Sequence, residues 1–469
     1  MFGTVLVANR GEIALRVVRT CKEMGIRTVA VYSSADEDSP VVRMADEAVR
    51  IGPPPARRSY LYAPAILQAA RLTGAEAIHP GYGFVSEDAD FAEMCQAEGL
   101  TFIGPPPEVL AMLGDKAEAL RVLSAAGLPV LPGTHRPIAS AGEAVEAAAG
   151  IGFPIIVKAL SGGGGRGMAI AMHPSELPEA YARARSAARA VFGDERVYLE
   201  RYVESARHVE VQVLAGLHGQ VLHLGARDCS VQRRRQKLIE ETPVPGLPED
   251  VAAELCERTV EAARAVGYVG AGTFEFLLDD AGEFHCIEVN CRIQVEHPVT
   301  ELVTGVDLVR EQLHVAATGT PGITQDDVRL NGAAIECRVN AEDPARGFLP
   351  TPGTIESLTL PAGPFTRVDD HVRQGMRVSP FYDPLLAKVS VWAPDREQAI
   401  ARMERALSEC VVTGPGVSTT TAFLAGLLAH PLFRDGKHTT ARPAPSPPPG
   451  RSTGPPHGGG PPPRGAPAA

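Results

Sequence analysis

The segment that begins at Glu288 holds the densest set of residues in the chain that could do chemistry. Polar and apolar residues alternate through it, and the polar positions are Glu288, Asn290, Arg292, Gln294 and Glu296. An extended strand would place all five on one face. Carboxylate and amide oxygens, as in Glu288 and Asn290, suit Mg²⁺. Arg292 and Gln294 suit a small anion, with Glu296 as a candidate base beside it. A solvated strand face is the plainer alternative, but it would more often carry Thr, Lys and Ser.

Glu275 could complete a metal site with this segment. It stands mid-strand among apolar neighbours, in the run Thr273-Phe274-Glu275-Phe276-Leu277-Leu278. A carboxylate in such a place must face water, a cation or a hydrogen-bond network. Taken alone, Glu275 could simply lie on an exposed strand face.

A Gly-rich loop, Ser161-Gly162-Gly163-Gly164-Gly165-Arg166-Gly167, offers bare backbone amides. It formally matches GxGxxG, but a strand-like segment follows it where a dinucleotide site needs a helix. No Lys-Ser/Thr pair follows the glycines, so it is not a Walker A loop either. A hairpin tip that folds over phosphates remains, with Lys158 adding a positive charge. The alternative is a flexible surface hairpin.

Two further segments carry cations. Arg233, Arg234, Arg235 and Lys237 form a basic cluster in an acidic protein. Such a cluster could bind phosphate or bicarbonate, although a charge run is more commonly a solvated loop. In the second segment, Glu336-Cys337-Arg338-Val339-Asn340-Ala341-Glu342, the arginine could clamp an anion or pair with either glutamate of the segment.

The elements that must position these residues begin with a regular alternation through the first 112 residues. Apolar runs predict strands, and helical spacing predicts helices between them. The predicted strands are Thr4–Ala8, Arg27–Tyr32, Ala75–Ile78 and Leu100–Ile103, and the helices are Gly11–Met24, Ala63–Leu72 and Asp88–Glu98. This alternation predicts a parallel, doubly wound sheet that binds ligands at the carboxyl ends of its strands.

The pattern changes after residue 130. Strands at Ile155–Val157, Met168–Met172 and Val197–Leu199, with a helix at Glu176–Val191, predict a small α+β lid. Longer strands follow from residue 208 to about 300, and a further β-rich segment runs from Ala333 to about residue 440. Residues 441–469 are rich in Pro and Gly and contain no acidic residue, so we expect them to be disordered and without a catalytic role.

Composition excludes several classes of protein. The 469 residues are 44% hydrophobic and 22% charged, which is ordinary for a globular protein. Lys and Arg number 45 against 56 Asp and Glu, which argues against a general nucleic-acid or anionic-membrane binder. No apolar run approaches the ~20 residues that span a bilayer, and the first residues read as a strand rather than a signal peptide. The eight cysteines include no Cys-x-x-Cys pair, so we expect a reduced, cytoplasmic protein without a disulfide framework.

Together these segments indicate a nucleotide, a divalent metal, an anionic co-substrate and a base. The chemistry that combines them is an ATP-dependent ligase without a Walker motif.

Over residues 1–440 the chain resembles the biotin carboxylases, the ATP-grasp component of acetyl-CoA, acyl-CoA and pyruvate carboxylases. The resemblance rests on long motifs in a fixed order: residues 8–14 (ANRGEIA), 79–84 (HPGYGF), 162–168, 294–301 (QVEHPVTE) and 336–342 (ECRVNAE). It implies an N-terminal doubly wound domain (1–112), an ATP-grasp domain (113–330) with a mobile lid (about 131–203), a β-rich C-terminal domain (331–440) and a tail (441–469).

The resemblance also implies roles for individual residues. Those expected around ATP are Lys116, Lys158, Gly164, Gly165, Glu200, Arg201, Tyr202, Val203, His208, Gln232 and Arg235. Those expected to hold Mg²⁺ or Mn²⁺ are Glu275, Glu288 and Asn290. Those expected around bicarbonate are Lys237, Arg292, Gln294, Val295 and Glu296, with Glu296 as the base, and Arg338 and Tyr82 are expected to approach biotin.

The chain departs from the family pattern at a few positions. Arg235 stands where relatives usually carry His or an aromatic residue, Ala333 replaces a common His, and Cys291 stands where Thr is common. No Met-Lys-Met biotin acceptor appears. We therefore expect biotin on a separate carrier protein, a carboxyltransferase in trans, and a homodimer of this chain. The rival interpretations are another ATP-grasp ligase, or a non-catalytic ATP-binding subunit of a carboxylase.

Overall fold

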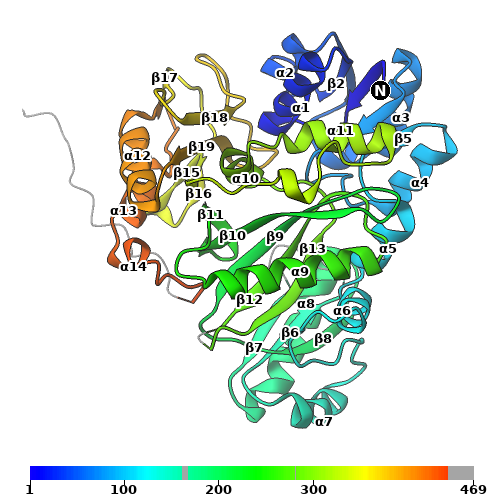
Figure 1. Cartoon of the computed structure of the whole chain (residues 1–469), viewed down its shortest axis with the longest axis vertical. Coiled ribbons are helices and arrows are strands. Elements are labelled where there is room, and N and C mark those ends of the chain that lie inside the picture. The colour runs from blue at the N-terminus through cyan, green and yellow to red at the C-terminus, as the bar shows by residue number, and fades with distance from the viewer. Residues whose placement is uncertain (161–166, 280, 442–469) are drawn as a thin grey trace, which may run out of the picture.

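The computed structural model describes residues 1–160, 167–279 and 281–441. The tip of the Gly-rich loop, with Gly164 and Gly165, and nearly all of the Pro/Gly-rich tail lie outside these residues. Figure 1 shows a large central sheet with the N-terminal unit above it, the lid below it and the C-terminal unit to one side.

The N-terminal unit is the predicted parallel sheet with helices around it, which confirms the doubly wound expectation. Its strands run in the order β3-β2-β1-β4-β5, and every pairing is parallel. They are β1 (Thr4–Val7), β2 (Arg27–Ser33), β3 (Glu47–Gly52), β4 (Ala77–His79) and β5 (Thr101–Phe102), and the helices are α1 (Gly11–Glu23), α2 (Pro40–Met44), α3 (Ala63–Thr73) and α4 (Ala89–Ala97). Strand β3 and helix α2 were not predicted.

Two loops at the carboxyl ends of β1 and β4 are tied together. The side-chain amide of Asn9 donates to the carbonyl oxygens of Pro80 (2.6 Å) and Tyr82 (2.8 Å). Gly81 lies between those acceptors with φ +62°, and a Cβ there would stand 2.9 Å from the Asn9 amide nitrogen. Only glycine fits this crossing, which fixes the loop that carries Tyr82.

The lid is a small antiparallel sheet in the order β7-β6-β8, covered by helices. Its elements are β6 (Ile155–Ala159), β7 (Met168–Ala171), β8 (Val197–Arg201), α7 (Ala141–Ile151) and α8 (Leu177–Phe192). The lid has a hydrophobic core of its own, which includes Ala144, Val157 and Ala184. Helices α5 (Pro107–Gly114) and α6 (Lys116–Ala125) lead into it from the N-terminal unit.

The central sheet has eight strands in the order β13-β12-β9-β10-β11-β14-β19-β18, and neighbouring strands are antiparallel. They are β9 (Arg207–Ala215), β10 (Val221–Arg233), β11 (Gln236–Thr242), β12 (Gly270–Leu278), β13 (Phe284–Asn290), β14 (Ala333–Asn340), β18 (Thr366–Asp370) and β19 (Leu385–Ala393). Because β11 pairs with β14, the sheet continues from the expected ATP-grasp domain into the expected C-terminal domain.

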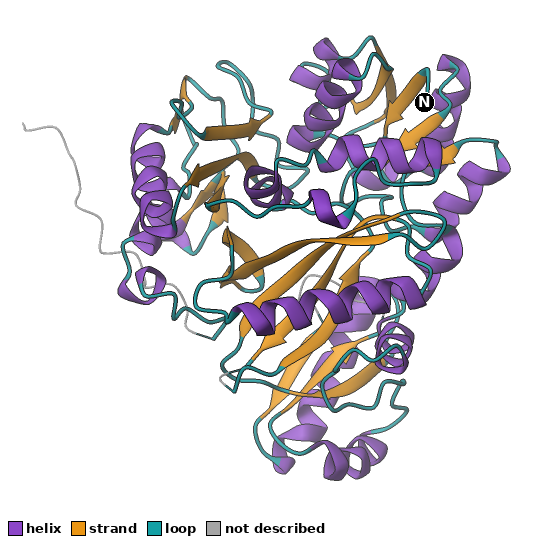
Figure 2. Cartoon of the chain, viewed as in Figure 1, coloured by secondary structure: helices purple, strands orange, loops and turns teal. Residues whose placement is uncertain are grey.

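Helices and short strands complete the structure (Figure 2). Helix α9 (Glu249–Ala265) crosses the central sheet, α11 (Leu308–Thr318) lies between the sheet and the N-terminal unit, and α10 (His297–Thr304) contacts β14 and β19. The C-terminal unit adds α12 (Arg396–Glu409), α13 (Thr421–Leu428), α14 (Pro431–Arg434) and the strand pairs β15 (Glu342–Asp343) with β16 (Leu349–Pro350) and β17 (Ser357–Thr359) with β20 (Val411–Thr413). The sequence predicted a β-rich segment here, and β14 to β20 lie in it; after residue 395, helices α12, α13 and α14 outnumber the strands. Short 3-10 helices are η1 (Ala56–Arg58), η2 (Pro174–Glu176), η3 (Gln325–Asp327) and η4 (Pro344–Arg346).

Apolar cores on either side support the central sheet. One buried cluster joins the N-terminal unit to the sheet and includes Leu6, Val31, Val209 and Phe274. Another fills the C-terminal unit around β14, β19 and α12. None of the described helices is both long enough and apolar enough to cross a membrane.

Candidate active site

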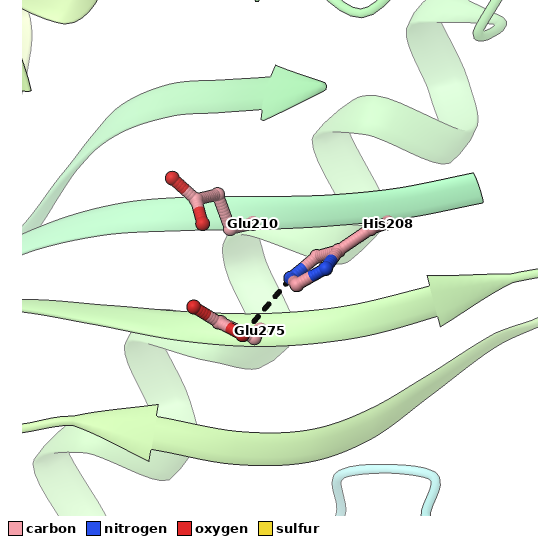
Figure 3. Close-up of side chains that lie close together, drawn as sticks. All are labelled: His208, Glu210 and Glu275. Carbon is pink, nitrogen blue, oxygen red and sulfur yellow. Dashed lines mark ion pairs between the residues drawn. The ribbon is translucent and has the colours of Figure 1, made fainter. Parts of the chain in front are cut away.

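Three glutamates form a row across neighbouring strands of the central sheet. The register pairs Glu275 of β12 with Glu210 of β9 on one side and with Glu288 of β13 on the other. Figure 3 shows His208 of β9 pointing toward Glu275, with Glu210 alongside, and the His208 Nε2 to Glu275 Oε2 distance is 2.9 Å. The ligand atoms of His208, Glu210 and Glu275 lie within 4.8 Å of one another.

Lys237 of β11 is the cation that faces this row. Its Nζ lies 2.6 Å from Glu210, 2.9 Å from Glu275 and 2.6 Å from Glu296. Burial lowers the pKa of Lys237, but the three carboxylates outweigh burial and raise it well above its usual value. The amine is therefore charged at any physiological pH.

The segment after Glu288 does not form the strand that its alternation predicted. Strand β13 ends at Asn290, the chain then turns, and Glu296 is the N-cap residue of α10. Pro298 in the first turn of that helix favours this start. The prediction of one extended polar face is therefore wrong. The polar side chains still converge, because the turn between Asn290 and Glu296 brings them back over the glutamate row.

The side chains of this turn form one hydrogen-bond network. Asn290 Nδ2 and Gln294 Nε2 donate to Glu275 Oε1, at 2.9 and 2.7 Å. Arg292 donates to the Asn290 side-chain oxygen at 2.9 Å and to Glu87 at 3.0 Å. Glu87 precedes α4 in the N-terminal unit, and sequence reasoning missed it.

Glu296 lies between two cations. Lys237 approaches its Oε1, and Arg338 Nη2 donates to its Oε2 at 2.9 Å. Burial raises the pKa of Glu296, but Lys237, Arg338 and Arg227 outweigh burial and hold the pKa well below the usual range. The side chain is 2% exposed, so a buried carboxylate is kept ionised by its neighbours.

Arg338 of β14 reaches this site from the expected C-terminal domain. Its Nε donates to Glu240 of β11 at 2.6 Å, in addition to its bond to Glu296. The glutamates of its own segment are not its hydrogen-bond partners: Glu336 accepts from Ser390, and Glu342 from Asn340. Burial raises the pKa of Glu240 to about 7 despite the Arg338 charge.

Two of the lysines expected around ATP are paired with carboxylates in this structure. Lys116 at the start of α6 pairs with Glu288, and Lys158 of β6 pairs with Glu200 of β8. The family resemblance implies that residues 200–203 form a hinge beside adenine, and these residues lie at the end of β8 and directly after it. Gln232 Nε2 lies 2.7 Å from His208 Nδ1, so these two residues expected around ATP are in contact with each other.

Tyr82 lies in the N-terminal unit, in the loop after β4. Its hydroxyl donates to Glu12 in the first turn of α1. A cavity of about 460 Å³ adjoins it, lined by residues of the N-terminal loops, among them Asn9 and Phe84, and by a C-terminal segment that includes His371 and Asp383.

The basic cluster at 233–237 is divided by the structure. Arg233 lies over the ring of Phe348 at 3.9 Å, while Arg234 and Arg235 occupy the turn between β10 and β11 with φ of +49° and +67°. Arg234 and Arg235 are exposed. Lys237 is the member that enters the glutamate row, whereas Arg234 and Arg235 have the exposure that the alternative of a solvated loop implies.

Buried charges that sequence reasoning missed support the predicted residues. Arg227 of β10 is fully buried and donates to side chains on several elements: Glu210, Gln212, Thr273, Gln294 and Thr300, at 2.6 to 3.2 Å. Glu210, Glu240 and Lys388 are likewise fully buried. The available signal was a charged residue inside an otherwise apolar strand, the same signal that singled out Glu275.

The donor set fits a hard divalent cation. Glu275, Glu288 and Asn290 offer carboxylate and amide oxygens from adjacent positions of β12 and β13. In this structure the protein's own cations and amide hydrogens occupy those oxygens, including Lys237 at Glu275 and Lys116 at Glu288. Carboxylate and amide oxygens that already contact positively charged side chains could instead bind Mg²⁺ or Mn²⁺.

Family comparisons cover almost the whole described chain. Residues 1–110 match the biotin carboxylase N-terminal domain, residues 115–321 the ATP-binding domain of the carbamoyl-phosphate synthase L chain, and residues 336–442 the biotin carboxylase C-terminal domain. A biotin carboxylase of a Nostoc species is 49% identical over 440 residues, which is 94% of this chain and 98% of the relative. A biotin carboxylase of Haemophilus influenzae is 51% identical over 415 residues, covering 88% and 92%.

Solved structures show the same architecture. A biotin carboxylase of Campylobacter jejuni in complex with beta-gamma-ATP superposes with a TM-score of 0.91 at 45% identity, covering 94% of this chain and 98% of that one. The biotin carboxylase domain dimer of Hydrogenobacter thermophilus 2-oxoglutarate carboxylase, in complex with MgADP, ADP and bicarbonate, superposes with a TM-score of 0.91 at 47% identity, covering 94% and 96%. With about half of the residues identical over 94% and 88% of its length to the Nostoc and Haemophilus influenzae relatives, the chain belongs to the biotin carboxylase family of ATP-dependent ligases.

Proposed function

We propose that this chain uses ATP and bicarbonate to carboxylate biotin carried by a separate protein. The observation that carries the proposal is the position of Glu296, a buried carboxylate held between Lys237 and Arg338. On one side of it lies the glutamate row, where a nucleotide and metal would bind, and on the other lies the Arg338 side of the site. A base at this position could deprotonate a bicarbonate that reacts first with ATP and whose carbon is then transferred to biotin.

In the first step Glu296 takes the proton of bicarbonate, and a bicarbonate oxygen attacks the γ-phosphorus of ATP as the bond to ADP breaks. Lys237, Arg292 and Gln294 surround the place where the anion would lie. Lys116 and Lys158 would contact the phosphates once these displace Glu288 and Glu200 from the two amines. Positive charges fixed around the transferred phosphoryl group stabilise its transition state.

Metal chemistry would add to this electrostatic stabilisation. We propose Glu275, Glu288 and Asn290 as the residues that hold Mg²⁺ or Mn²⁺. The bound ion would neutralise charge on the ATP phosphates. The side-chain oxygens that would bind it are the ones that Lys237, Lys116 and Arg292 contact in this structure.

In the second step the carboxyphosphate formed from bicarbonate breaks down to CO₂ and phosphate. The phosphate removes the proton from the ureido nitrogen of biotin, and that nitrogen then forms its bond to the carbon of CO₂. Arg338 would stabilise the developing enolate oxygen. Its Nη1 donates no hydrogen bond within the part of the chain that the structure describes, since Nε and Nη2 face Glu240 and Glu296.

Partners follow from the same proposal. A biotin carboxyl carrier protein and a carboxyltransferase would act in trans, and the chain would form a homodimer like the H. thermophilus domain. A reducing compartment such as the cytoplasm is supported by the eight cysteines, all of which are buried and unpaired.

The test is release of ADP from MgATP, measured with and without bicarbonate and with and without free biotin. Avidin treatment of the protein controls for a carried-over biotinylated partner. The proposal requires that ADP release depends on bicarbonate and rises with biotin. ADP release that ignores biotin would favour another ATP-grasp ligase, and ATP binding without turnover would favour a non-catalytic subunit.

A further inference from the structure

Lys388 is a fully buried lysine in the middle of β19. An ammonium group is costly to remove from water unless it is paired and hydrogen-bonded. The residue has no part in the steps described above. Its contacts therefore have to account for its presence.

The Lys388 amine makes two polar contacts that join different parts of the fold. Its Nζ donates to the backbone carbonyl oxygen of Val295 at 2.8 Å, and it lies 3.1 Å from Glu12 Oε1 in α1. Burial lowers the pKa of Lys388, but Glu12, Glu336 and Asp369 outweigh burial and raise it. The amine thus brings a full positive charge to a carbonyl of the turn that precedes α10.

That carbonyl belongs to the peptide unit between Val295 and Glu296. The turn from Cys291 to Glu296 lies outside any helix or strand, so no regular ladder holds this peptide. The Val295 carbonyl lies in a partly buried place, and its hydrogen-bond donor there is the buried amine of Lys388. The hydrogen bond fixes the backbone directly between Gln294 and Glu296, the two side chains proposed to contact bicarbonate.

We infer that Lys388 is a positioning residue for bicarbonate, acting through the Val295 carbonyl on the backbone that carries Gln294 and Glu296. The inference rests on the proposed function. A purely structural lysine would stabilise the fold without favouring either substrate. A positioning lysine has to affect the use of bicarbonate more than the use of ATP, because the lysines and hinge expected around ATP lie on other elements.

Lys388→Met tests this difference, because methionine fills similar space without the charge or the hydrogen bond. The measurement is the KM for bicarbonate and the KM for MgATP in ADP release. We expect the bicarbonate KM to rise about tenfold or more, the effect of losing a hydrogen bond to a charged group. The MgATP KM should change less than about twofold, an order-of-magnitude bound for a contact that ATP does not make.

Two further variants separate positioning from folding. Arg396→Gln removes another cation of the C-terminal unit, which pairs with Glu241 on the opposite face of β11 from Glu240. It should lower the melting temperature and leave the bicarbonate KM unchanged. Lys388→Met combined with Glu12→Gln removes both charges of the buried pair. It should fold better than Lys388→Met alone and keep the raised bicarbonate KM relative to Glu12→Gln.

The outcomes distinguish the inference from the proposed function. If the unaltered chain shows no bicarbonate-dependent ADP release, both are overturned. If the unaltered chain is active and Lys388→Met, or the double variant, raises both KM values equally or neither, only the role of Lys388 is overturned. A selective rise in the bicarbonate KM supports it.

Discussion

The base strength of Glu296 depends on which cations contact it. With Lys237 and Arg338 in place, its pKa lies well below the usual range, so the carboxylate is a weak proton acceptor. Bicarbonate that enters between Lys237 and Glu296 would draw the amine toward itself and leave the carboxylate more basic. In the proposed mechanism the same two cations would keep Glu296 ionised before the substrate arrives, and Lys237 would bind the anion afterwards.

Glu296→Gln keeps the size of the side chain and removes the proton acceptor. We expect bicarbonate-dependent ADP release to fall at least about a hundredfold, the lower end for loss of a general base. MgATP binding, measured by calorimetry, should change little. Glu254→Gln on the exposed face of α9 is the matched control, since it also removes one carboxylate. Near-normal turnover in Glu296→Gln would remove this residue from the role of base.

Glu240 should make stability depend on pH in the direction opposite to a surface carboxylate. Burial raises its pKa in the folded chain to about 7, above the value in the unfolded chain. Between these two values the folded state binds more protons, so its stability falls as pH rises. The slope attributable to Glu240 is at most about 1.4 kcal/mol per pH unit, and it ends once pH exceeds the folded-state pKa.

Glu240→Gln removes this titration. The free energy of unfolding of the unaltered chain, relative to that of Glu240→Gln, should decrease from pH 5 to pH 7 and level off above that range. Urea denaturation at a series of pH values measures it. A difference that is constant with pH would show that Glu240 is ionised throughout, held so by Arg338.

At the scale of elements, periodicity predicted most of the N-terminal sheet and misjudged the turn that carries the base. Strict alternation from Glu288 to Glu296 is the pattern of a strand, and it is correct as far as Asn290. Beyond that point the strand does not continue, because Glu296 at the N-cap and the proline in the first helical turn fix the start of α10. The alternation then reflects a turn whose polar groups face one cluster.

The partners of the predicted residues could not be read from the sequence. Lys237 was identified, but its contact Glu210 was not. Glu210 lies on β9, where strand register makes it the cross-strand neighbour of Glu275. From the sequence, Arg338 could have paired with Glu336 or Glu342 of its own segment. Its partner is instead Glu240 on β11, which is 98 positions away in the sequence. Such pairings depend on strand order, which local patterns do not contain.

Arg227 should be one of the most sensitive positions of the central sheet. Arg227→Met would remove the buried donor to Glu210 Oε1 and to the side-chain oxygen of Gln294, while Lys237 would still contact the other Glu210 oxygen. We expect a loss of about 3–5 kcal/mol in the free energy of unfolding, as for a broken buried ion pair. Urea denaturation measures it, with Arg258→Met on the surface of α9 as a control within about 0.5 kcal/mol. A loss below about 1 kcal/mol would mean that Arg227 is not the support inferred here.

At the scale of the whole molecule, the last described residues pack against β10 and against the segment just before β9. His438 stacks on Phe433 and lies 3.2 Å from Asp228, and Thr440 donates through its backbone N–H to the Ala206 carbonyl at 2.9 Å. Ala206 precedes β9, a few residues after the hinge. The end of the C-terminal unit thus supports the strand that carries His208.

Two truncations test this packing. A chain that ends at residue 441 should keep its stability and its MgATP KM, since residues 442–469 are rich in Pro and Gly and contain few residues that could form a core. A chain that ends at residue 436 loses a partner of the buried Asp228, so we expect it to lose about 1–3 kcal/mol of stability and to bind MgATP more weakly. Thermal unfolding and titration with MgATP compare the two. Equal behaviour would show that residues 437–441 contribute nothing.

The continuous eight-stranded sheet also bears on how the chain is made. Strand β14 lies between β11 and β19, and β18 pairs only with β19 at the edge, so neither β14 nor β18 has its full set of neighbours before residue 393 has been synthesised. Until then Glu240, Glu336 and Arg338 lack the strand that carries Lys388. Because long-range strand pairing is slow and leaves edges exposed, a nascent chain that emerges from the ribosome would hold an unfinished, charge-bearing sheet until its last third appears. The central sheet can therefore reach its native strand order only after the C-terminal third of the chain has been synthesised.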